Sequence, residues 1–169
     1  MRLIFLGEFG DGAKINSKKK RFLCPEEEVM KMEYKIENKI TPRDYNNLRK
    51  SVGWDSKKIQ ITQNALDSSV IVKKATFENK AIGMARVVGD GLYYYIVDVV
   101  VNPEYQNKGI GKLLIESIVK DIEARTKIGQ KCSIYLISMK GKEEFYEKCG
   151  FTKIPYDYTG YGMIRRIEK

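Results

Sequence analysis

The segment 99–114 constrains this chain more than any other part of its sequence. An apolar, β-branched strand breaks at an Asn-Pro pair and leads through a glycine-rich turn into a helix-forming run. At such a junction the first N–H groups of the helix lack partners, and with the positive end of the helix dipole they favour phosphate. Gly109 and Gly111 let the backbone approach the anion without an intervening Cβ atom. The sequence therefore predicts a ligand that carries phosphate.

Two common phosphate-binding patterns do not match this segment. A dinucleotide fingerprint needs a third small residue where Leu114 stands. A P-loop needs glycine at the position of Gln106 and serine or threonine at the position of Leu113. Hydride transfer and nucleotide hydrolysis are therefore not favoured.

The order of the predicted elements indicates an α/β protein with a mixed sheet. Thr41-Pro42 has the residues of a helix start. We expect helices over 41–52, 55–66, 110–122 and 143–149, and strands over 33–40, 69–77, 81–88, 92–101, 131–138, 151–154 and 162–167. Residues 1–31 show little periodicity, and we predict a separate N-terminal extension of unknown role or an artefact of the start site.

Two motifs together resemble those of the GCN5-related N-acetyltransferases, the GNAT family. The first is Gln106-x-x-Gly109-x-Gly111, which resembles the family's pyrophosphate loop; the second is the segment 145–151, Phe-Tyr-Glu-Lys-Cys-Gly-Phe. They occur in the family's order, and the resemblance covers roughly residues 32–169. It implies a single GNAT-like domain at 32–169, with a mostly antiparallel sheet of about seven strands and about four helices.

The resemblance implies an acetyl-CoA site and no metal. The main chain of Val99 and Val101 would bind the pantetheine arm, as an added strand would. The physical requirement is a divergence between the strand ending at Val101 and the strand at 131–138, which exposes backbone groups to the ligand. The other expected contacts of acetyl-CoA are Gln106, Asn107, Lys108, Gly109, Ile110, Gly111, Lys112 and Ser138. The alternative is an ordinary capped turn without a ligand.

Tyr146 is the expected catalytic acid, by its position in the second motif. When an amine attacks a thioester, a thiolate leaves, and its thiol has a pKa of roughly 8.5. A phenol with a pKa of about 10 can donate a proton or a hydrogen bond to that sulfur. The alternative is a tyrosine that only packs its ring.

The resemblance makes Asp98 the candidate general base. The chain contains no histidine, so acid–base work falls to Tyr, Asp, Glu, Cys, Lys or water. Asp98 stands in an otherwise apolar strand, where burying a carboxylate costs several kcal/mol unless it has partners. Family members often use a carboxylate on this strand, acting through water. Asp98 could equally make a structural hydrogen bond, and deprotonation through water without a single base stays open.

Aromatic residues are the expected contacts of the acceptor. Trp54 follows a predicted helix, and Tyr161 lies in a tyrosine-rich tail with an aspartate nearby. Such residues suit an amine that bears an apolar group. They could also be plain core and surface aromatics.

These observations predict a cytoplasmic N-acetyltransferase that joins acetyl-CoA and a small-molecule or peptide amine by direct attack in a ternary complex. The alternative is a non-catalytic module that senses acyl-CoA. The net charge of +9 is compatible with nucleic acid, but we expect none, because no helix-turn-helix or aromatic RNA-binding signature is present. No apolar run reaches the roughly 20 residues of a membrane span. A homodimer stays open.

Overall fold

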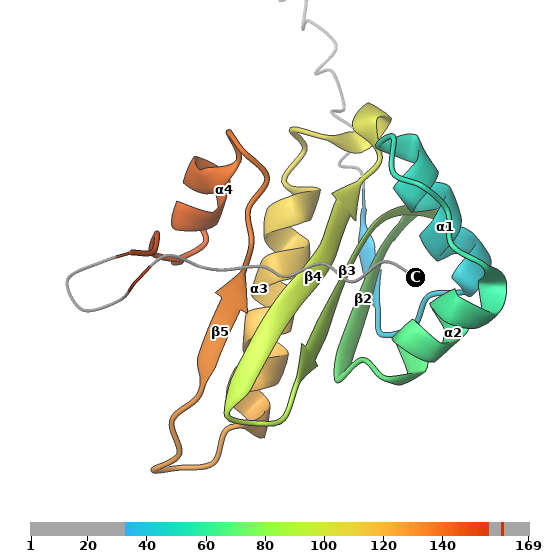
Figure 1. Ribbon diagram of the computed structural model, residues 1–169. Helices are drawn as coiled ribbons and strands as arrows, with labels where there is room; N and C mark the ends of the chain where they lie inside the picture. Colours follow the sequence, from blue (N-terminus) through green and yellow to red (C-terminus); the bar gives the residue numbers. More distant parts are fainter. Residues whose placement is uncertain (1–32, 156–159, 161–169) are drawn as a thin grey trace, which may run out of the picture. The chain divides into compact units, whose positions relative to one another are not determined.

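The computed structural model describes residues 33–155 and residue 160. The chain divides into two units, residues 1–31 and 32–169, and all that follows concerns the second (Figure 1). Its helices are α1 (Pro42–Ser51), α2 (Ile59–Asp67), α3 (Ile110–Arg125), α4 (Glu143–Glu147) and the short 3-10 helix η1 (Pro103–Tyr105). Its strands are β1 (Lys35–Glu37), β2 (Ile71–Phe77), β3 (Lys80–Gly89), β4 (Tyr93–Val101) and β5 (Ser133–Leu136). None of the described helices is both long and apolar enough to cross a membrane.

The described residues form one open sheet in the order β1-β2-β3-β4-β5. The first three pairings are antiparallel, and β5 runs parallel to β4 after the crossover through α3. Within residues 33–155 the α/β class, the mixed sheet and four α-helices are confirmed, but the expectation of about seven strands is wrong, since the sheet that these residues form has five. At 151–154 the chain forms no strand: the Phe151 N–H donates to Tyr146 O at 3.1 Å, and Pro155 has no N–H to donate. The predicted strand at 162–167 lies outside the described residues.

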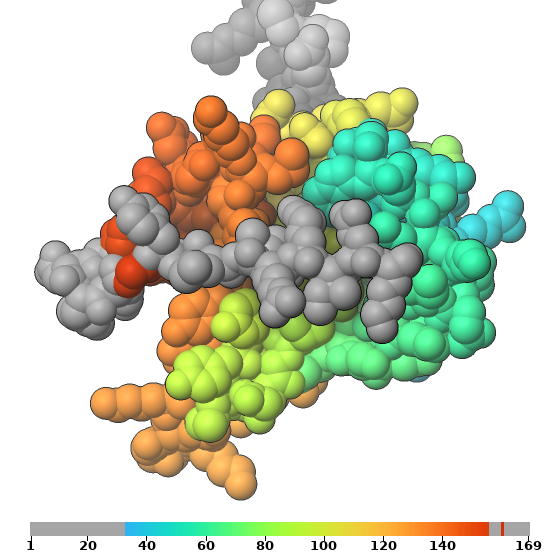
Figure 2. Space-filling view, viewed as in Figure 1, coloured from blue at the N-terminus to red at the C-terminus, as the bar shows by residue number. Residues whose placement is uncertain are grey.

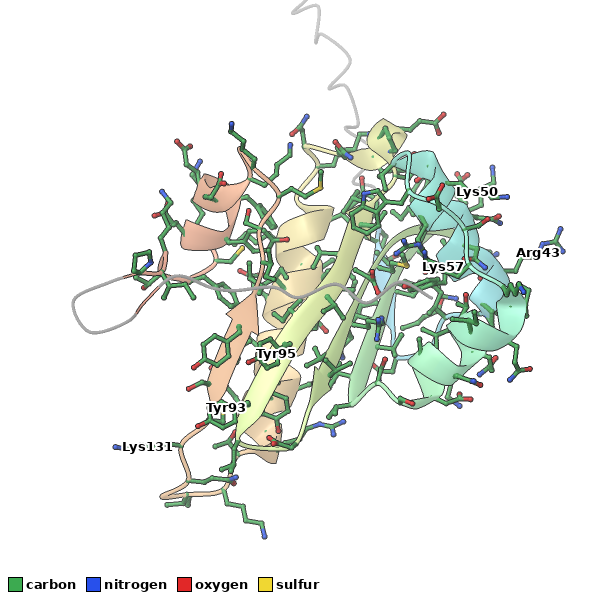
Figure 3. All side chains as sticks on the ribbon, viewed as in Figure 1. Arg43, Lys50, Lys57, Tyr93, Tyr95 and Lys131 are labelled. Atoms are coloured by element: carbon green, nitrogen blue, oxygen red, sulfur yellow. The ribbon has the colours of Figure 1, made fainter. Side chains whose placement is uncertain are left out.

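Two hydrophobic clusters cover the two faces of the sheet. On one face α3 packs its apolar stripe, formed by Ile110, Leu114, Ile115, Ile118 and Ile122, against residues of β2, β3 and β4. On the other face α1 and α2 contribute Tyr45, Leu48 and Leu66, which pack with Met84 and Val100. This second layer does not extend over the first half of β4. There Tyr93 and Tyr95, which are labelled in Figure 3, are about half exposed. In Figure 2 side chains from this part of the sequence, drawn in yellow-green, lie at the visible surface.

A β-bulge in β4 decides which of its residues face which helix. Val97 lies opposite Arg86 and Val100 lies opposite Met84, so Asp98 and Val99 together oppose one residue of β3. Asp98 has a φ of 53°, a left-handed conformation that aspartate tolerates better than most residues. Because a bulge adds one residue, every later side chain changes face. Val99 therefore packs on the α3 side and Asp98 turns toward α1.

Candidate active site

The glycine-rich loop between β4 and α3 is ordered by its own side chains. Asn102 Oδ1 accepts a hydrogen bond from the Glu104 N–H at 3.1 Å, and Gln106 Nε2 donates to Val101 O at 2.9 Å. Asn107 and Gly109 have φ values of 59° and 80°. Residues in the left-handed conformation at positions 107 and 109 turn the N–H groups of the loop toward one point. Such a cluster of N–H groups forms a concave site that binds anions.

The first turn of α3 supplies further donors to the same place. The first N–H of α3 with an intrahelical acceptor is that of Leu113, which donates to Gly109 O at 3.0 Å. The N–H groups of Ile110, Gly111 and Lys112 precede it and have no helical carbonyl to bind. A Cβ atom at Gly109 would meet nothing within 4 Å. The loop therefore combines free donors, the positive end of a helix dipole and open space, which fits a pyrophosphate.

The backbone of β4 next to this loop is free on the side that faces β5. The pairing of β4 with β5 ends at Ile96 and Leu136, while β4 continues to Val101. The Asn102 N–H donates to Ile82 O at 2.8 Å, so by antiparallel alternation the backbone groups of Val101 point away from β3. Those of Val99, two residues earlier, share that direction. The pairing of β4 and β5 therefore stops before the end of β4, as the expected binding of an acetyl-CoA arm to Val99 and Val101 requires.

Helix α4 brings the second motif against the first. A Cβ atom at Gly111 would lie 3.1 Å from Phe145 Cζ, so the Phe145 ring covers the first turn of α3. The neighbouring Tyr146 packs edge-on against the rings of Phe145 and Phe151, at 4.9 and 6.2 Å between centroids. Among the described residues its hydroxyl has no hydrogen-bond partner. Burial raises the pKa of Tyr146, with a smaller contribution from Cys149, so the phenol stays protonated and able to donate.

Asp98 lies in a network of charged groups. Its Oδ2 accepts hydrogen bonds from Arg86 Nε and from the Tyr45 hydroxyl, both at 2.6 Å, and its Oδ1 accepts one from Arg49 Nη1 at 3.1 Å. All three charged side chains are less than one-fifth exposed. Burial, followed by the hydrogen bond to Asp98, raises the pKa of Tyr45. This geometry favours the structural alternative for Asp98, because both oxygens already have partners.

Trp54 lies at the connection between α1 and α2, on the same side of the sheet as Asp98. The Arg49 guanidinium stands over the Trp54 ring at 5.1 Å and near the Tyr45 ring at 5.8 Å. An open depression of about 580 Å³ is lined there by Arg49, Gly53, Trp54, Asp55 and Lys57. Trp54 therefore has a place at a concave surface, as a substrate contact requires.

Three further expectations concern residues away from this network. Ser138 follows the end of β5, and its hydroxyl donates to Met139 O at 2.9 Å. Tyr161 lies outside the described residues. Over residues 33–155 and 160, no group of three or more His, Cys, Asp or Glu side chains is placed to hold a metal ion.

The sequence analysis missed Arg49, Arg86, Tyr45 and the contact of Phe145 with Gly111. An arginine in a strand or an amphipathic helix carries no local signal that it pairs with a distant carboxylate. The one available hint was Asp98 itself, since a carboxylate in an apolar strand needs cationic partners.

Comparisons with known proteins show which proteins this chain is similar to. Residues 67–153, which include the loop and α4, match the acetyltransferase (GNAT) domain model. An uncharacterized N-acetyltransferase, ycf52, from Pyropia yezoensis is 28% identical over 94% of this chain and 97% of its own length. The chloroplastic GCN5-related N-acetyltransferase 1 of Arabidopsis thaliana is 30% identical over 72% of this chain, which spans 61% of that relative.

A solved structure shows the same architecture. The protein of unknown function, probable acetyltransferase, from meticillin-resistant Staphylococcus aureus superposes with a TM-score of 0.68 at 27% identity, over 79% of this chain and 100% of that one. The family model covers more than half of the chain, and both motifs fall on the site just described. The chain belongs to the GCN5-related N-acetyltransferase (GNAT) family of acetyltransferases.

Proposed function

We propose that this protein transfers an acetyl group from acetyl-CoA to a primary amine by direct attack within a ternary complex. The observation that carries the proposal is the cradle of free N–H groups at the start of α3, beside the unpaired edge of β4. A pyrophosphate and an extended amide-bearing arm need these two features side by side. Membership of the GNAT family supports acetyl-CoA as the donor.

The chain's own residues divide the work of binding. The N–H groups from Asn107 to Lys112 would hold the pyrophosphate, and the glycines leave room for its approach. The main chain of Val99 and Val101 would hold the pantetheine arm. Val101 O is already bonded to Gln106, so its N–H is the group that remains for the ligand.

Acetyl-CoA supplies the acetyl group as a thioester when it is bound. The acceptor nitrogen forms a bond to the carbonyl carbon, and the carbon–sulfur bond breaks. Tyr146 donates a proton or a hydrogen bond to the departing sulfur, and its raised pKa keeps that proton available. The acceptor nitrogen loses its own proton to water, since the oxygens of Asp98 are held by Arg49, Arg86 and Tyr45.

A thiol-release assay with acetyl-CoA and a panel of amines tests this function. We expect Tyr146→Phe to lower kcat about 100-fold, within the range for general acid catalysis, and to change acetyl-CoA affinity little. Tyr93→Phe is the matched control, because Tyr93 is about half exposed and begins β4, at the end of the strand away from the loop. Full turnover in Tyr146→Phe would rule out the acid role. Tight acetyl-CoA binding without thiol release for any amine would favour the sensor alternative. The cytoplasmic location stays a prediction.

A further inference from the structure

We propose that the acceptor amine carries an anionic group, a carboxylate or a phosphate, which Arg49 and Lys57 bind in the depression at the α1–α2 connection. This inference rests on the proposed function and names the class of its substrate. Three observations support the inference. The connection between α1 and α2 is held by hydrogen bonds, the guanidinium of Arg49 has an unused N–H edge, and the charges around the depression are positive in sum.

The depression has a rigid wall, although it lies in a connection between two helices. Asn46, which is 7% exposed, donates from Nδ2 to Lys57 O and accepts from the Lys57 N–H at Oδ1, both at 2.9 Å. Arg49 Nε donates to Asp55 O, and the Trp54 N–H donates to Arg49 O, again at 2.9 Å. These hydrogen bonds hold the connection between α1 and α2 at both ends. A ligand therefore binds there without the entropic cost of ordering a flexible segment.

Arg49 is held in place with part of its guanidinium unused. Nε bonds to Asp55 O and Nη1 to Asp98, while Nη2 has no partner among the described residues. The guanidinium lies near the rings of Tyr45 and Trp54, which limit its movement. A fixed guanidinium with a free N–H edge is a good donor to the paired oxygens of a carboxylate or phosphate.

The charges around the depression leave an excess of positive charge. Asp98 carries one negative charge but faces both Arg49 and Arg86, so one guanidinium is not neutralised. In the lining, Lys57 makes no ion pair with a described residue, and Asp55 supplies one carboxylate. Lys57 lines the depression, whereas Arg43 on α1 points away from the fold (Figure 3). The net balance favours an anion in the depression and disfavours a polycationic acceptor.

The depression is also connected to the reaction site. Asp98 lies in the bulge of β4 and forms an ion pair with Arg49. The next residue, Val99, lies on the part of β4 that has no pairing with β5. An acceptor anchored by its anion at Arg49 would approach β4 from the α1 face. The donor cradle lies at the α3 end of the same strand, so the two substrates would enter from different sides.

Matched pairs of acceptors test the inference with the full chain. β-Alanine is compared with β-alaninamide, and phosphoethanolamine with ethanolamine, so the two pairs separate carboxylate from phosphate. We expect the anionic member of one pair to have a kcat/KM at least about tenfold above its neutral partner, as for one added charged contact. Lys57→Gln should remove most of that advantage, because it lowers the kcat/KM of the anionic member of the pair. Arg43→Gln removes the same charge outside the depression and should preserve the advantage.

A second measurement does not depend on turnover. Trp54 is the only tryptophan of the chain, so its fluorescence reports directly on the depression. We expect titration with inorganic phosphate or acetate to change this fluorescence in the wild type and in Arg43→Gln, but not in Lys57→Gln.

The outcomes separate this inference from the proposed function. Equal use of neutral and anionic amines, with no effect of Lys57→Gln, overturns the inference and leaves the acetyltransferase function standing. No thiol release with any amine counts against the function, and the fluorescence titration then decides the inference alone. A fluorescence that neither anion changes also overturns it.

Discussion

The ring of Phe145 lies against Gly111, where a Cβ atom would come within 3.1 Å of its Cζ and 3.4 Å of its Cε2. This contact joins the two motifs that lie far apart in the sequence. It sets the position of α4, and therefore of Tyr146, relative to the N-terminus of α3. The absence of a side chain at position 111 is thus a packing requirement, in addition to its role in the proposed phosphate site.

Gly111→Ala should therefore displace α4. We expect a loss of about 1–2 kcal/mol in the free energy of unfolding, as for other overpacked sites, and a lower kcat. Adding Phe145→Leu should make room for the new methyl group and recover part of both losses. Denaturant unfolding and thiol release of the two single variants and the double variant measure this. If the losses of the two single variants simply add in the double variant, the proposed effect of the Phe145–Gly111 contact is wrong.

Gly109→Ala should weaken the binding of acetyl-CoA without a steric clash inside the protein. Gly109 has a φ of 80° and nothing within 4 Å of its Cβ position, so alanine there adds about 1 kcal/mol of backbone strain and a methyl group beside the anion. We expect the KM for acetyl-CoA to rise about tenfold.

Gly129→Ala is the control for this change, because Gly129 has a φ of 82° and equally open surroundings, in the turn before β5. It carries the same strain and should leave the KM for acetyl-CoA unchanged. Equal effects of the two substitutions would show that strain alone, and not the phosphate site, is responsible.

The pH dependence of turnover follows from the environment of Tyr146. Burial raises its pKa above the usual value of about 10. The proton-donating form predominates well below the raised pKa and is lost as the pH rises through it. We expect no fall in kcat from this residue between pH 7 and about 9. A titration of kcat over that range, with Tyr146→Phe alongside, checks it; an alkaline fall near pH 8 that the variant abolishes would refute it.

Asp98→Asn should mainly lower stability. The substitution leaves Arg49 and Arg86 facing each other without a counter-charge in a site less than one-fifth exposed. We expect a loss of about 2–4 kcal/mol in the free energy of unfolding, measured by urea denaturation. Glu104→Gln, at an exposed carboxylate without an ion pair among the described residues, should cost almost nothing. An Asp98→Asn protein of full stability that has lost turnover would instead support a role as general base.

Much of the proposed acetyl-CoA site was predictable, because its geometry depends on residues that are adjacent in the sequence. The left-handed conformation of Gly109, the unpaired N–H groups of the first helical turn and the end of β4 all follow from residues adjacent in the sequence. A strand followed by a glycine turn and a helix N-terminus brings unpaired N–H groups together, independently of the rest of the fold. The order of the strands and helices was also predictable from periodicity, which depends on neighbouring residues alone.

The strand count and the surroundings of Asp98 depended on long-range contacts. Asp98 takes its partners from α1, 49 residues away in sequence, and from β3, 12 residues away. The bulge that turns its side chain toward α1 arises from the pairing of β4 with β3, and no local pattern marks it. The segment 151–154 has a strand-like composition, yet its first N–H closes α4 instead of joining the sheet.

The sequence by itself thus determined that a glycine-rich turn with unpaired N–H groups lies between a strand and a helix, with a tyrosine-bearing segment downstream. Only the tertiary structure decided that Phe145 seats this segment on Gly111 and that Asp98 is bound by two arginines. The physical reason is that backbone geometry at a helix start depends on adjacent residues. Strand register, burial and ion pairing depend on which distant segments pack together.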